Sequence, residues 1–180
     1  MNALVLDVED RGTRGGLKGP RAAEWLFSQG IALPMSPNSW TRSPAGGASS
    51  LLVARLGQQE FFLEEEAGGG ALERLLAALA PAPPGVYPVL REDFAFQLLG
   101  EGVHDVLAQV CNVNFAVLDL DSRPLIMTLM IGVAVLAVPE RSGAQPRYRF
   151  WCDPTFGPSL SENLAAVVLD CGGGIRGAPA

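Results

Sequence analysis

The first residue pair that could do chemistry is His104, the only histidine of the chain, with Asp105 beside it. An imidazole oriented by a carboxylate can act as a general base. The apolar residues around this pair recur at helical spacing, however, and adjacent residues of a helix do not face each other. We therefore interpret His104 as a surface or packing residue.

The three cysteines, Cys111, Cys152 and Cys171, are the candidate nucleophiles. A catalytic thiol needs a base within reach, but Cys111 follows His104 by seven residues, which is roughly 10 Å along a helix. Cys111 and Cys152 stand among apolar neighbours, which is typical of inert core cysteines. An odd number of widely spaced cysteines predicts neither a disulfide framework nor a zinc site.

Aspartates and glycines offer weaker candidates. Asp119 and Asp121 could share a metal ion, but no third ligand is close in sequence, and a solvated loop is the simpler interpretation. Asp153 precedes a proline, which is typical of a turn or cap. The glycines at 15–19 and 100–102 lack both phosphate-binding fingerprints and predict tight turns. The sequence thus predicts no catalytic, cofactor-binding or metal-binding residue.

The pattern of secondary-structure elements around these residues occurs twice in the chain. The stretch Leu98–Leu107 predicts the end of a strand, a glycine turn and a helix that folds back. A similar stretch, Leu17–Leu26, occurs 81 residues earlier. Because a fixed offset indicates internal repetition, we interpret the chain as two related halves. The matching positions are Leu17 and Leu98, Gly19 and Gly100, Ala22 and Val103, Trp25 and Val106, and Leu26 and Leu107.

Each half predicts a strand, a helix, a hairpin and a helix. Neither half can bury a small sheet alone, so we expect a duplicated α+β fold with mixed or mainly antiparallel sheets. We expect one domain over residues 1–180, with a first half at about 17–80, a second at about 86–171 and a flexible tail at 172–180.

Three details of the second half are also predicted. The strand pattern begins at Val86–Leu90, and the apolar run Leu125–Val138 predicts one or two buried strands. Ser159 and Glu162 have capping-box spacing for the last helix. The helix face to be buried against the apolar run consists of Val103, Val106, Leu107 and Val110.

Composition limits the classes of function. The chain is 48% hydrophobic and 18% charged, with a net charge of −6 and a single lysine. Nucleic-acid binding rests on clustered basic residues, so that class is excluded. The longest apolar run is shorter than the roughly 20 residues that span a bilayer, and the N-terminal residues do not resemble a signal peptide. We expect a soluble, cytoplasmic protein without membrane association.

The connection from Ile31 to Ser50 is rich in proline, serine and glycine. Long connections of this kind are often functional, and aromatic residues anchor many interfaces. We therefore expect Trp40 to be partly exposed and to face a partner protein.

Short motifs spread from about Leu17 to Leu164 carry a family resemblance. In chain order they are Leu17–Leu26, Gly30-Ile31, Leu33-Pro34, Asn38 and Trp40, Val53–Gly57, Glu60–Leu63, Arg91–Asp93, Leu98–Gly100, Val106–Cys111, Met127-Thr128, Gly132-Val133 and Tyr148–Asp153. Together they resemble the gamma subunit of heterotetrameric sarcosine oxidase.

This resemblance implies a fold similar to the folate-binding domain of the glycine-cleavage aminomethyltransferase. It also implies larger alpha and beta partner subunits that carry the flavin, NAD and tetrahydrofolate sites. The complex would oxidatively demethylate sarcosine or a similar N-methyl amino acid and pass the one-carbon unit to tetrahydrofolate. This chain would be its non-catalytic small subunit. The alternatives are a free-standing folate- or pterin-binding protein and a structural adaptor without a ligand.

Overall fold

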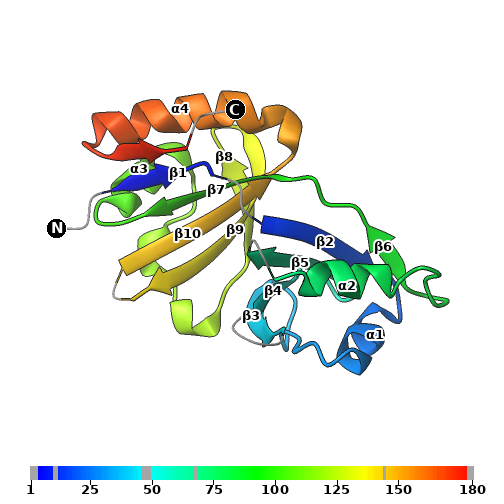
Figure 1. The fold of residues 1–180 in the computed structure, drawn as a ribbon. Helices are drawn as coiled ribbons and strands as arrows, with labels where there is room; N and C mark the ends of the chain where they lie inside the picture. The colour runs from blue at the N-terminus through cyan, green and yellow to red at the C-terminus, as the bar shows by residue number, and fades with distance from the viewer. Residues whose placement is uncertain (1–3, 10–11, 46–49, 67–68, 144, 178–180) are drawn as a thin grey trace. The chain divides into compact units, whose positions relative to one another are not determined.

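The chain divides into two units near residue 92. A computed structural model describes residues 4–9, 12–45, 50–66, 69–143 and 145–177. One unit is the continuous segment Arg11–Glu92, and the other combines Met1–Asp10 with Asp93–Ala180. Each unit has its own sheet (Figure 1). Each also has its own hydrophobic core.

The Arg11–Glu92 unit is built on an antiparallel sheet. Among the described residues this sheet has five strands in the order β3-β4-β5-β2-β6, and each neighbouring pair is antiparallel. The expected hairpin is present as β4 and β5. The elements are β2 (Gly12–Lys18), α1 (Ala22–Ser28), β3 (Ser39–Pro44), β4 (Ser50–Arg55), β5 (Glu60–Glu66), α2 (Ala71–Ala77) and β6 (Tyr87–Val89).

Leucine and phenylalanine side chains fill the core of this unit. Leu17 of β2, Phe61 of β5, Leu26 of α1 and Leu72 of α2 are buried in one cluster. Helix α2 lies along β2 and β5 (Figure 1). At its start the Glu65 carboxylate accepts a 2.8 Å hydrogen bond from the N–H of Leu72. A carboxylate suits the positive end of the helix dipole.

The second unit is built on a mixed sheet. Over the residues that the structure describes, this sheet has six strands in the order β11-β1-β7-β10-β9-β8, and β1 with β11 is its parallel pair. The elements are β1 (Val5–Asp7), β7 (Phe94–Leu99), α3 (Val103–Val110), β8 (Ile126–Met130), β9 (Val133–Ser142), β10 (Gln145–Cys152), α4 (Gly157–Asp170) and β11 (Gly174–Arg176), with short 3-10 helices η1 (Phe115–Val117), η2 (Leu120–Ser122) and η3 (Pro154–Phe156).

The apolar face of α3 is buried, as its spacing predicts. Leu107 is 1% exposed, and its cluster includes Met130 of β8 and Val135 and Ala137 of β9. The other members of the predicted face lie in the same cluster: Val103, Val106 and Val110. Helices α3 and α4 pack beside each other, and α4 also contacts β1 and β11 (Figure 1).

The two units present their elements in the same order. Along the chain, a strand, a helix, three strands, a helix and a strand follow one another from β2 to β6 and again from β7 to β11. In the sheet of the second unit, β1 lies between β7 and β11. Helices α1 and α3 begin at Ala22 and Val103, which keeps the offset of 81 residues. Each unit therefore has a three-stranded meander and a closing strand where the sequence predicts only a hairpin.

Several expected boundaries are wrong. Residues 174–176 of the expected flexible tail form strand β11 instead. The Gly174 N–H donates to the Leu4 carbonyl at 2.9 Å, and a parallel ladder with β1 follows. Residues 178–180 of the expected tail lie outside the described residues. Strand β6 pairs with β2, so it closes the first unit instead of opening the second. Helix α4 begins at Gly157, two residues before Ser159, so the predicted capping box is not its start.

Candidate functional site

His104 and Tyr148 form a polar pair in the second unit. Helix α3 supplies His104 on its first turn, and β10 supplies Tyr148, which is paired with Leu98 of β7. The imidazole Nε2 lies 2.6 Å from the phenol oxygen, and the two rings meet edge to face at 5.7 Å. Tyr148 is 1% exposed. A phenol buried this deeply needs a hydrogen-bond partner, and His104 provides it.

The environment keeps the phenol of Tyr148 in its neutral form. Burial raises the pKa of Tyr148, and the positive charge of Arg141 on β9 offsets part of this rise. The direction of the hydrogen bond depends on the imidazole tautomer. With the imidazole proton on Nδ1, the phenol donates to Nε2; with the proton on Nε2, the imidazole donates to the phenol oxygen.

A cavity of about 200 Å³ opens beside this pair. Residues of α3, η1, η2, β9 and β10 contribute to its wall, so it lies wholly within the second unit. Its walls combine apolar side chains with a few polar groups, which is the usual composition of a small-molecule pocket. The lining residues are His104, Phe115, Ala116, Leu118, Leu120, Arg141, Pro146 and Tyr148.

The cysteines are not arranged for nucleophilic catalysis. Cys152 is buried on β10, where burial, together with the charges of Asp153 and Asp93, raises its pKa to about 11. Its thiol is therefore protonated at neutral pH. The Cys111 sulfur lies 3.7 Å from the Thr128 hydroxyl. Cys171 is exposed, and all three cysteines are free.

The carboxylates of Asp119 and Asp153 cap the short 3-10 helices that follow them. The Asp119 carboxylate accepts from the Asp121 N–H at 3.0 Å and caps η2. The Asp153 carboxylate accepts from the N–H and the hydroxyl of Thr155, and these hydrogen bonds lower the pKa of Asp153. Within the described residues, no three His, Cys, Asp or Glu side chains lie close enough to hold a metal ion. Asp105, the neighbour of His104, is exposed on α3.

The predicted glycine turns are present at Gly19 and Gly100, whereas Gly15 and Gly16 lie within β2, where they pair with Leu63 and Phe62 of β5. Gly19 and Gly100 have φ angles of +121° and +98°, which side-chain-bearing residues rarely adopt. A Cβ atom at Gly19 would also collide with the carbonyl oxygen of Gly85.

Trp40 is not the exposed anchor that the sequence predicts. It lies on β3, is paired with Ala54 of β4, and is only 8% exposed. The preceding connection is held in place by Arg55, whose guanidinium donates to the carbonyl oxygens of Pro34 and Met35 at 3.3 and 3.2 Å. The expectation fails because strand pairing outweighs the loop-like composition of this segment.

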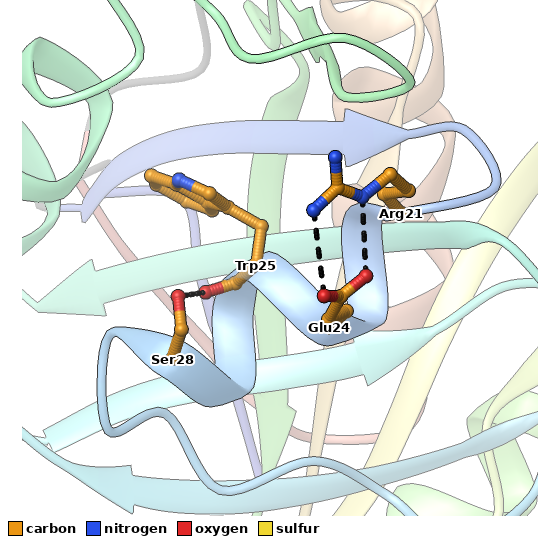
Figure 2. A network of polar contacts seen from close by, with 4 residues as sticks. All are labelled: Arg21, Glu24, Trp25 and Ser28. Atoms are coloured by element: carbon orange, nitrogen blue, oxygen red, sulfur yellow. Dashed lines mark hydrogen bonds and ion pairs between the residues drawn. The ribbon is translucent and has the colours of Figure 1, made fainter.

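Figure 2 shows a polar network of four residues in the first unit. The same residues line another hollow. The Arg21 guanidinium donates to both carboxylate oxygens of Glu24 at 3.1 and 3.4 Å, and the Ser28 hydroxyl donates to the Trp25 carbonyl at 2.6 Å. This ion pair raises the pKa of Arg21 and lowers that of Glu24. Since the two charges neutralise each other at the surface, the hollow of about 210 Å³ offers a ligand little net charge.

Strand β8 exposes an apolar surface that the sequence analysis missed. Met127 and Leu129 alternate along β8 and are exposed, and Ile131 in the turn after the strand is exposed too; we call these three residues the β8 surface. Among the described residues β8 stands at the edge of its sheet, with β9 as its partner strand and one further bridge from Met130 to Cys111. The sequence predicts that the strands of the run Leu125–Val138 are buried. This prediction is wrong for the outer face of β8. Because nearly all residues of this run are apolar, the sequence does not show which alternate positions face the solvent.

The chain is similar to solved structures, of which two are described here, whereas no family model and no curated protein matches it. The heterotetrameric sarcosine oxidase from Corynebacterium sp. U-96, in complex with pyrrole 2-carboxylate, matches with a TM-score of 0.69 and 24% identity, over 93% of this chain and 85% of that chain. The glycine cleavage system aminomethyltransferase T from Bartonella henselae matches with a TM-score of 0.69 and 18% identity, over 90% of this chain and 45% of that chain.

These similarities establish the kind of fold. The chain is a mixed α+β protein whose fold is related to both structures, as the family resemblance implies. It spans about half the length of the aminomethyltransferase chain. The longest helix of the described part, α4, has 14 residues, and no helix there has the length and hydropathy of a membrane span.

Proposed function

We propose that this chain is the non-catalytic small subunit, of the gamma type, of a flavin-dependent complex that oxidatively demethylates sarcosine or a similar N-methyl amino acid. The observation that carries the proposal is the two-sided match to a chain of a heterotetrameric sarcosine oxidase, which takes in 93% of one chain and 85% of the other. The match to the aminomethyltransferase leaves more than half of that enzyme without a counterpart.

In this proposal the chemistry belongs to the larger alpha and beta subunits. They hold the flavin, the NAD and the tetrahydrofolate that receives the one-carbon unit, and this chain contributes no catalytic, cofactor-binding or metal-binding residue. The state of the candidate nucleophile supports this division, because Cys152 is buried with a pKa raised to about 11. A thiol of that kind is inert at neutral pH.

The β8 surface is the part of the chain best suited to a partner subunit. An exposed edge strand presents unpaired backbone groups, and isolated proteins usually protect such edges with charges or prolines. Here the exposed positions are Met127, Leu129 and Ile131. Permanent subunit interfaces are more hydrophobic than transient ones, which fits an apolar edge of this kind.

The proposal also includes an origin by duplication. The same order of elements in both units, with the offset of 81 residues kept at the start of α1 and α3, supports two halves derived from one ancestral unit. Superposition of the two halves, about 17–79 on 96–169, is the check. Equivalent packing of Ala22 and Val103 is expected, and unrelated surroundings for these residues would contradict duplication.

Affinity purification of the tagged full chain from its own cells tests the subunit assignment. We expect two larger proteins to co-purify in fixed proportion, and the assembly to oxidise an N-methyl amino acid. With tetrahydrofolate present, the product should be a methylene-folate instead of free formaldehyde. A chain that elutes alone and binds tetrahydrofolate or a pterin would favour the alternative, a free-standing binding protein with the aminomethyltransferase fold.

A further inference from the structure

The cavity beside His104 and Tyr148 has features that the subunit proposal does not use. Its apolar wall includes Phe115, which is buried, together with Leu118 and Leu120, which are half-buried. Its volume of about 200 Å³ is below the roughly 300–1,000 Å³ of pockets that hold drug-sized molecules. A ligand that fits here is small and has an apolar body.

The charge in this cavity has the opposite sign to that of the whole chain. The chain has a net charge of −6, yet the described residues that line the cavity include the Arg141 guanidinium and no carboxylate. Arg141 lies close enough for its charge to act on the phenol of Tyr148. The polar end of the cavity is therefore suited to a negatively charged group.

The hydrogen bond between His104 and Tyr148 can orient a donor toward such a group. When the imidazole proton is on Nε2, His104 donates to the phenol oxygen at 2.6 Å. The phenol proton is then free to be donated to an oxygen of the ligand. A guanidinium and a phenol donor together match the two oxygens of a carboxylate.

We propose that this cavity binds a small carboxylate with an apolar body, whose carboxylate contacts Arg141 and the Tyr148 hydroxyl and whose body packs against Phe115, Leu118 and Leu120. His104 acts as a positioning residue that orients the phenol proton. The proposal concerns a site within the second unit and is independent of the subunit assignment.

Benzoate is a suitable probe, and benzamide is its uncharged counterpart of nearly the same shape. The full chain is titrated with each compound by calorimetry or by ligand-observed NMR. Because hydrogen bonds to charged groups contribute about 1.5–3 kcal/mol, we expect benzoate to bind at least about tenfold more tightly than benzamide. Binding should also favour the Nε2–H tautomer of His104, which its ¹⁵N chemical shifts report.

Variants distinguish this cavity from other surface sites. Arg141→Gln should weaken benzoate binding at least about tenfold and should leave benzamide binding unchanged. Tyr148→Phe retains the ring and should also weaken benzoate binding. Arg74→Gln is the matched control, because Arg74 is an exposed arginine that lines a different cavity, in the first unit; it should change nothing.

Three results would overturn the proposal: no saturable binding of benzoate, equal binding of benzoate and benzamide, or unchanged benzoate binding by the Arg141→Gln variant. The Arg141 side chain is exposed, so its replacement tests the site even if Tyr148→Phe does not fold.

Discussion

At the scale of single residues, the buried face of α3 illustrates how local spacing becomes stability. Leu107 lies at the middle of this face and is buried in a cluster that also contains residues of β8, β9 and α4. Close-packed interiors relax only partly when a side chain is shortened, so the cost exceeds that of lost hydrophobic transfer alone.

Leu107→Ala should destabilise the chain by about 2–5 kcal/mol, as for other buried leucines. Denaturant unfolding of the isolated chain measures this loss. The control is Leu169→Ala on α4, whose side chain is 57% exposed and whose replacement should change the free energy of unfolding by less than about 0.5 kcal/mol. A loss below about 1 kcal/mol for Leu107→Ala would contradict the packing described for this face.

The thiol of Cys152 should make stability depend on pH in the alkaline range. Its pKa is raised from 9.0 in the unfolded reference to about 11 in the fold. Between these two values the unfolded state loses its proton first, so the contribution of this thiol to stability is fully present below about pH 9 and is lost as the pH rises toward about 11. Unfolding curves at several alkaline pH values check the sign, and the Cys152→Ala variant should lose this contribution.

Alkylation by iodoacetamide gives an independent check on the thiols. Cys171 is exposed and Cys152 is buried, so Cys171 should react first at neutral pH, and Cys152 should react only when the protein unfolds. Rapid modification of Cys152 in the folded protein would contradict both its burial and its raised pKa.

Residue types and spacing predicted the packing residues better than the candidate site. The buried face of α3 follows from local periodicity, and the turns at Gly19 and Gly100 follow from residue type. A single sequence displays both signals directly. The contact of His104 with Tyr148 joins residues 44 positions apart, and it depends on how a helix packs on a sheet. No motif spacing reports such a contact, so the cavity beside it could only be found in the structure.

At the scale of elements, β8 is the clearest candidate for a docking surface. Leu129 is 57% exposed on this edge strand, the same fraction as Leu169 on α4. The two leucines belong to the same unit, which makes them a matched pair for testing which surface a partner covers.

Leu129→Glu should weaken the association with partner subunits at least about tenfold, because a charge would be buried in an apolar interface. Leu169→Glu should leave association unchanged. Both substitutions should leave the thermal midpoint of the isolated chain nearly unchanged, since the side chains are exposed. Quantitative recovery of partners on each tagged variant is the measurement, and equal recovery would place the interface elsewhere.

The element order was largely predictable, whereas strand pairing at the ends of the chain was not. The helices α1, α3 and α4 and the hairpin of β4 and β5 follow from periodicity and turn residues. Strand β1 comes from the start of the chain but pairs with β7 and β11. Pairing over such separations leaves no local signal, and so the expected flexible tail was wrong. Composition also misled at Trp40, where strand β3 occupies a segment with loop-like residues.

At the scale of the whole molecule, two units with the same order of elements make up a fold similar to that of the aminomethyltransferase. The functional account rests on one further fact, the match over most of both chains to a chain from the heterotetrameric sarcosine oxidase. In the proposed function, this chain takes part in the assembly of the complex, and its partner subunits carry out the redox chemistry.

The most direct measurement is the visible absorption spectrum of the assembly captured on the tagged chain, recorded without oxygen before and after sarcosine is added. The account predicts a flavin spectrum that is bleached by the substrate, because the N-methyl amino acid reduces the partner's flavin, and a colourless chain when it is purified alone. An assembly without flavin, or flavin that stays with this chain after its partners are removed, would contradict the account.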